Sequence, residues 1–104
     1  MKAVALSLIF SLLATSAVEA AGSVRRGRAI AQKYCAMCHS IGKTGPSPKA
    51  GTVPFRDLHL RYPIDDLDEA LGEGLAINHP DMPEITMSVA QIDDFKAFIR
   101  SLNR

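Results

Sequence analysis

Hydrophobic positions recur at helical spacing in two long segments, one on each side of an irregular middle. From Ser23, a favourable N-cap, to Tyr34, small and apolar residues repeat every three or four positions and arginines take the other side. The second segment starts at Ser88, where Gln91 completes a capping box. One apolar stripe follows it: Ile92, Phe95, Ile99 and Leu102, beside Phe98. The pattern predicts two amphipathic helices whose apolar faces form a core.

A shorter helical pattern lies between them. Ile64, Leu67 and Leu71 fall on one face behind an acidic first turn, and Gly72 and Gly74 are expected to end the helix. No segment shows strand-like alternation. The chain is therefore predicted to be all-α, with three to four helices.

The stretch 40–61 has no helical periodicity and is interrupted by glycine and proline. A structureless loop of about 20 residues is unusual in a small domain unless it is disordered or functional. Its apolar residues favour a loop wrapped around a cofactor, for which they would form a wall: Val53, Phe55, Leu58 and Leu60.

Residues 1–20 are typical of a cleaved secretory signal peptide, with Lys2, an apolar run over 3–14 and small residues before the expected cleavage after Ala20. The run is short for a membrane span, which needs about 20 apolar residues. We therefore expect one exported, periplasmic domain over residues 21–104 and no membrane span in the mature chain.

Charge adds little to the choice of partner. The whole chain has a net charge of +1, and removal of one lysine and one glutamate with the leader leaves that balance unchanged. There is no basic run or aromatic ladder of the kind that binds nucleic acid or an acidic membrane. Nucleic acid is not an expected partner.

The pentapeptide Cys35-Ala36-Met37-Cys38-His39 carries the clearest chemical signal. Two thiols three residues apart can bond the two vinyl groups of one heme, and the following imidazole can bind its iron. On a helical turn the three side chains share a face. A redox dithiol or a disulfide remains open, whereas zinc is disfavoured because the chain has only two cysteines.

A second iron ligand is expected in the segment 75–85. Met82 and His79 can both bind iron, and Met87 lies just beyond. Met82 is flanked by Pro80 and Pro83, which stiffen the backbone and suit a weak thioether ligand.

Taken together, the C-x-x-C-H motif, the Met82-Pro83 loop and the C-terminal helix make the chain similar to small bacterial class I cytochromes c. This resemblance implies one covalent heme c bound through Cys35 and Cys38, with His39 as the proximal ligand and Met82 as the distal ligand. It also implies a crossing of the first and last helices at Gly27 and Phe98. A backbone carbonyl in Thr52-Val53-Pro54-Phe55, that of Val53 or Pro54, would accept a hydrogen bond from His39.

The function that the resemblance implies is one-electron transfer between redox partner proteins, by a monomer that is not an enzyme. One alternative is a small heme subunit of a larger periplasmic dehydrogenase. Another is a heme ligand sensor or peroxidase-like module, which would need an accessible iron. Arg56, Arg61 and Tyr62 are candidates to contact the heme propionates.

Overall fold

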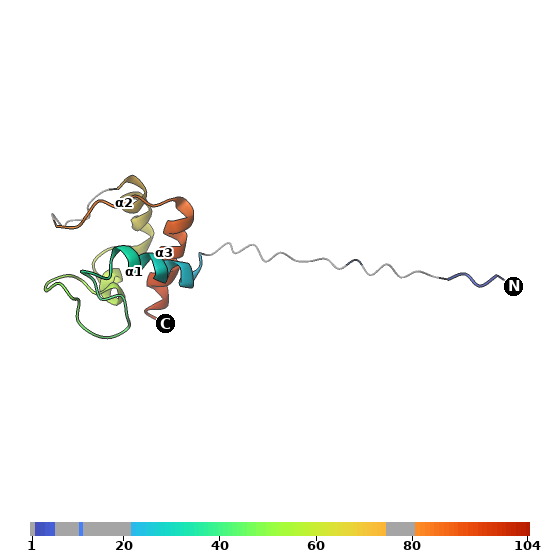
Figure 1. The fold of residues 1–104 in the computed structure, drawn as a ribbon, viewed down its shortest axis with the longest axis horizontal. Helices are drawn as coiled ribbons and strands as arrows, with labels where there is room; N and C mark the ends of the chain where they lie inside the picture. The colour runs from blue at the N-terminus through green and yellow to red at the C-terminus, as the bar shows by residue number, and fades with distance from the viewer. Residues whose placement is uncertain (1, 6–10, 12–21, 75–80) are drawn as a thin grey trace.

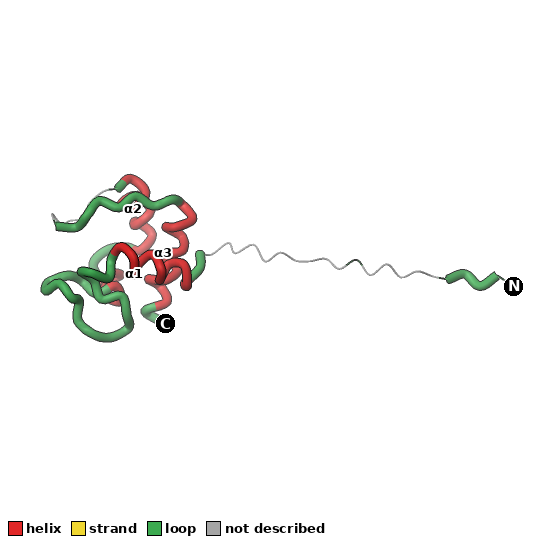
Figure 2. The backbone as a smooth tube through the Cα atoms, in the orientation of Figure 1, coloured by secondary structure: helices red, strands yellow, loops and turns green. Residues whose placement is uncertain are grey.

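The computed structural model describes residues 2–5, 11, 22–74 and 81–104, which contain helices joined by loops (Figures 1 and 2). The helical elements are α1 (Val24–Tyr34), η1 (Phe55–Leu60), η2 (Ile64–Asp66), α2 (Leu67–Glu73) and α3 (Val89–Ser101). No strand occurs in the described ranges, and the expected all-α class is confirmed. The proposed cleavage after Ala20 and the alternative ligand His79 lie outside these ranges. None of the described helices is long and apolar enough to cross a bilayer.

Helix α1 begins where the sequence predicts. The Ser23 hydroxyl accepts a hydrogen bond from the Arg26 backbone N–H at 3.2 Å, which satisfies one of the N–H groups left unpaired at the start of the helix. Gly27 and Ala31 face inward and are buried. On the outer side, the Arg28 guanidinium carbon lies 5.6 Å from the centre of the Phe98 ring.

Helix α3 supplies most of the core. Its predicted capping box is present: the Gln91 N–H donates to the Ser88 hydroxyl and the Gln91 side chain accepts from the Ser88 N–H. All members of the predicted apolar stripe are buried, and Phe98 and Ile99 are the largest fully buried side chains in the described chain. This burial holds α3 against α1 and α2.

The crossing of α1 and α3 is very close. A Cβ on Gly27 would lie 1.9 Å from the Asp94 carbonyl oxygen and 2.7 Å from the Phe98 Cβ. Only a glycine at this position allows the backbones of α1 and α3 to come into contact, as the family resemblance implies. Gly22, which the sequence did not single out, has the same role, since its Cβ would meet the Asp93 carbonyl at 2.1 Å.

A buried carboxylate locks this crossing. Asp94, which is 7% exposed, accepts hydrogen bonds from the Ser23 backbone N–H at 2.7 Å and from Arg26 Nε at 3.0 Å. The hydrogen bond from Arg26, together with that from Ser23 and the positive charge of Arg26, lowers the pKa of Asp94, although burial acts in the opposite direction. The contact ties the start of α1 to the first turns of α3.

The middle of the chain departs from the prediction in three places. The stretch after Ser40 is not structureless, because residues Phe55–Leu60 form the 3₁₀ helix η1. Leu60 does not join an apolar wall, since it is 71% exposed. Gly72 does not end α2; the helix continues to Glu73 and is capped by Gly74 in the left-handed conformation, φ 74°.

We expect Gly27→Ala to destabilise the fold, because the added methyl group overlaps backbone atoms of α3 that cannot rotate away. Overpacking of this kind costs about 1–3 kcal/mol. Gly72→Ala is the matched control: its Cβ would meet only the Ile92 Cδ1 at 3.6 Å, and alanine in a helix is favoured by roughly 0.5–1 kcal/mol. Thermal unfolding of both variants measures the difference. Equal midpoints would show that the crossing is not tight.

A second prediction concerns acid stability. Because its pKa is lower in the folded than in the unfolded chain, Asp94 stabilises the fold above its unfolded value of about 3.9, and this stabilisation disappears as the pH falls through the folded value. Asp94→Asn should cost about 1–3 kcal/mol at pH 7 and progressively less below about pH 4. Denaturant unfolding at several pH values measures the change, with Asp93→Asn at the exposed neighbour as control. A cost independent of pH would contradict the assignment.

Candidate functional site

The Cys35–His39 motif lies directly after α1 and continues its winding for one turn. Cys35 is the C-cap of the helix, and its carbonyl accepts hydrogen bonds from the N–H groups of Cys38 at 3.2 Å and His39 at 2.9 Å. One helical turn therefore joins the three side chains, as the spacing predicts. All three line the same cavity.

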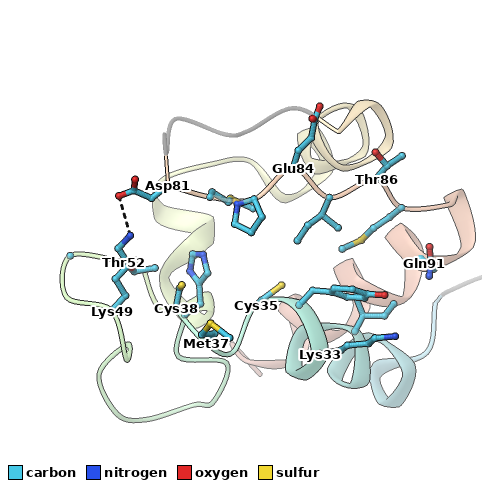
Figure 3. Close-up of a pocket in the computed structure, with 18 of the residues that line it drawn as sticks. Lys33, Cys35, Met37, Cys38, Lys49, Thr52, Asp81, Glu84, Thr86 and Gln91 are labelled. Atoms are coloured by element: carbon cyan, nitrogen blue, oxygen red, sulfur yellow. Dashed lines mark hydrogen bonds and ion pairs between the residues drawn. The ribbon is translucent and has the colours of Figure 1, made fainter.

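This cavity has a volume of about 660 Å³, which lies within the range of small-molecule and cofactor sites. Figure 3 shows Cys35 and Cys38 on one side of it and the loop that carries Asp81 and Glu84 on the other. Met82 and Met87 also line it. A smaller cavity of about 60 Å³ adjoins these residues and is walled mainly by apolar side chains, including Val53, Phe55 and Leu58 of the predicted wall.

The imidazole of His39 is held in one orientation. Its Nδ1 lies 2.7 Å from the Val53 carbonyl oxygen, and because a carbonyl can only accept, Nδ1 carries the proton. The lone pair is then on Nε2, which is the form that binds a metal. The ring also packs against Phe55, with centroids 4.7 Å apart, and Phe55 in turn meets Phe95 edge to face at 5.5 Å.

The carbonyl of Val53, not that of Pro54, is thus the partner of His39. The sequence left these two open because the match to the family segment was loose. Pro54 instead begins η1, where its carbonyl accepts from the Asp57 N–H at 2.9 Å. The short helix therefore uses the one carbonyl and leaves the other for the imidazole.

Two methionines reach the site from the loop before α3. Met82 is partly exposed, whereas Met87 is 6% exposed and belongs to the hydrophobic core, with its N–H bonded to the Leu71 carbonyl at 2.9 Å. Both methionines line the two cavities, and so does His39. The core position of Met87 gives it a packing role that Met82 lacks.

Neither thiol is part of a disulfide. Burial raises the pKa of Cys35 to about 11, so in the polypeptide without an attached group this thiol is protonated at neutral pH. Among the described residues, no three Cys, His, Asp or Glu side chains come together as a metal ion requires.

The candidates for propionate contacts lie apart from the main cavity. The half-buried Arg56 donates from Nη1 to the Ser40 hydroxyl at 3.2 Å, Tyr62 lines the smaller cavity, and Arg61 is exposed. None of the three lines the larger cavity.

Sequence reasoning missed the ion pair of Lys49 Nζ with Asp81 Oδ2, 3.1 Å apart, across the mouth of the cavity (Figure 3). The two residues are separated by 32 positions and lie in irregular segments. No local pattern could have paired them.

The residues present fit a covalently bound heme. The cavity has a suitable size, two unpaired thiols lie on one turn, and an imidazole faces it with Nδ1 engaged by a backbone carbonyl. The adjoining small cavity is apolar, which suits a large flat ligand.

Comparisons with known proteins agree with this assignment. The family model for cytochrome c matches residues 24–103. The chain is also similar to cytochrome c-552 of Bradyrhizobium diazoefficiens, at 30% identity over 95 residues, which cover 91% of this chain and 89% of that protein. No solved structure matches at a significant level.

Proposed function

The chain belongs to the cytochrome c family, and on this premise we propose its specific role. Members of this family are heme-based electron carriers, and their covalent heme c agrees with the two cysteines of the motif. We propose that it is a periplasmic one-electron carrier with His39 and Met82 as the axial ligands of the iron. The observation that carries the proposal is the pairing of His39 with the Val53 carbonyl, at 2.7 Å, beside a cavity that Met82 also lines.

The chain's own residues would prepare the site as follows. Heme c, when bound, supplies an iron that takes up and releases one electron. The Val53 carbonyl orients His39 and, by accepting from Nδ1, raises the basicity of Nε2. Phe55 packs against the ring and is itself supported by Phe95, so the imidazole does not need to reorient when the charge of the site changes.

On the distal side we assign the ligand to Met82 rather than Met87. Met87 is buried in the core and its backbone is bonded to Leu71, so moving it toward the cavity would disturb the packing against α3. Among the described residues Met82 makes no such core or backbone contact, and Pro83 restricts the backbone that follows it. Thioether ligation raises the reduction potential relative to a second imidazole.

The periplasmic location rests on the leader-like sequence of residues 1–20, which we propose to be removed after export. Family members are typically electron carriers rather than enzymes, and their partners are redox proteins. We propose a monomer that receives and passes on one electron through the edge of the cofactor near the cavity mouth.

The ligand assignment is tested by Met82→Leu, with Met87→Leu as the matched control because both keep side-chain volume and lose the sulfur. Met82→Leu should lower the reduction potential by about 100 mV or more, since axial ligands move heme potentials over a range of about 0.8 V. It should also let carbon monoxide bind the reduced protein rapidly. Potentiometry and visible spectra of the holoprotein measure both effects, including loss of the methionine-to-iron band. Equal changes in the two variants would show that the wrong methionine has been chosen.

Electrostatic steering of the partner should be weak. The charged side chains that line the cavity are of both signs: Lys33 and Lys49 are positive, and Asp81 and Glu84 are negative. The chain as a whole has a net charge of +1. Between about 10 mM and about 150 mM ionic strength, the bimolecular electron-transfer rate should change by less than about threefold. Stopped-flow kinetics with a cationic and with an anionic small redox reagent measure it. A steep fall of the rate with ionic strength for either reagent would contradict a balance of positive and negative charges around the cavity.

A further inference from the structure

One segment connects the two sides of the cavity. Lys49 is bonded through its backbone N–H to the Cys38 carbonyl, at 3.3 Å, and through its side chain to Asp81, which immediately precedes Met82. Four residues further on, Val53 holds His39. The two ends of the segment 49–53 therefore contact the attachment motif. The Lys49 side chain also reaches Asp81 beside Met82 (Figure 3).

The position of Lys49 is fixed by a tight turn. The Thr52 N–H donates to the Lys49 carbonyl at 3.2 Å, and Gly51, at the third position of the turn, has φ 76°. A positive φ at that position is typical of turns that favour glycine. The ammonium group therefore projects from an ordered backbone, and less conformational entropy is lost when it pairs with Asp81 than if the loop were irregular.

Residues 81–87, the described part of the methionine loop, make few other polar contacts with described residues. Among interactions between described residues, its far end is fixed by the Met87 N–H to the Leu71 carbonyl, and the Lys49–Asp81 pair is the side-chain contact near Met82. Consecutive Cα atoms lie about 3.8 Å apart, so restraining Asp81 also limits how far Met82 can move.

We propose that Lys49 and Asp81 are positioning residues, whose ion pair holds the methionine loop over the cavity and favours the conformation in which Met82 reaches the iron. The proposal rests on the ligation by Met82 proposed above. Because a thioether is a weak ligand, a small bias in loop position changes how often an external ligand can replace it.

The size of the effect follows from exposure. The side chains of Lys49 and Asp81 are 47% and 75% exposed, so the pair is screened by water and salt. Exposed pairs of this kind shift an equilibrium by about two- to fivefold at low ionic strength.

The test is equilibrium binding of imidazole to the oxidised holoprotein at low ionic strength. Lys49→Gln and Asp81→Asn should each tighten imidazole binding about two- to fivefold, because the methionine is displaced more easily. The double variant should match either single variant instead of giving the product of their effects. Charge reversal by Lys49→Glu should be rescued by adding Asp81→Lys, and about 1 M salt should abolish the difference from wild type.

Two further variants separate this proposal from simpler explanations. Asp68→Asn removes another ion pair, Lys96 Nζ to Asp68 Oδ1 at 2.7 Å, which joins α2 to α3 outside the cavity lining, and it should leave imidazole binding unchanged. In the Lys49 and Asp81 variants the methionine-to-iron band should weaken in step with the tighter binding, which a merely structural role would not produce.

The outcomes that overturn the proposal are distinct from those that overturn the ligand assignment. If Met82→Leu strongly tightens imidazole binding while the Lys49 and Asp81 variants behave as wild type, the positioning role is wrong and the ligation stands. Additive effects in the double variant would also refute the pair. If Met82→Leu leaves imidazole binding unchanged, the ligation and the positioning role both fall.

Discussion

The close crossing of α1 and α3 is the constraint on which the rest of the molecule depends. Gly27 lets the two backbones touch, and the Asp94 carboxylate then fixes how far along α3 the first helix sits. Because Cys35 caps α1 directly, the crossing also sets where the attachment turn enters the cavity. A core of this size gives only marginal stability on its own, so a small loss of packing energy at the crossing would also disturb the heme site.

The two faces of the site are held by different means. On one side, His39 is hydrogen-bonded to Val53 and packs against Phe55, which in turn meets Phe95, and all four residues are at least partly buried. On the other side, residues 81–87 are held by a backbone hydrogen bond at Met87 and an exposed ion pair at Asp81. This asymmetry makes the side that carries His39 the more firmly held, and it leaves the side that carries Met82, the ligand proposed above, more responsive to its surroundings.

Local signals decided how much of this structure could be predicted. Caps and periodicity were sufficient for α1 and α3, because a Ser N-cap and an apolar stripe act within a few residues. The helix η1 was missed because a short 3₁₀ turn has no amphipathic period, and Gly72 was misread because a helix tolerates one glycine. The thiols and imidazole were recognisable from their spacing. The Val53 carbonyl and the Lys49–Asp81 pair depend on distant segments meeting, which no local pattern encodes.

The tight packing of Gly22 against Asp93 has a practical consequence for where the domain can be fused to another protein or immobilised. This glycine lies at the opposite end of α1 from Cys35, and a helix of 11 residues is about 16 Å long. A polypeptide, linker or electrode surface joined just before residue 22 would therefore be anchored beside α3, away from the cavity mouth. Immobilisation through this end should present the redox face outward, with the cofactor edge still open to a partner in solution.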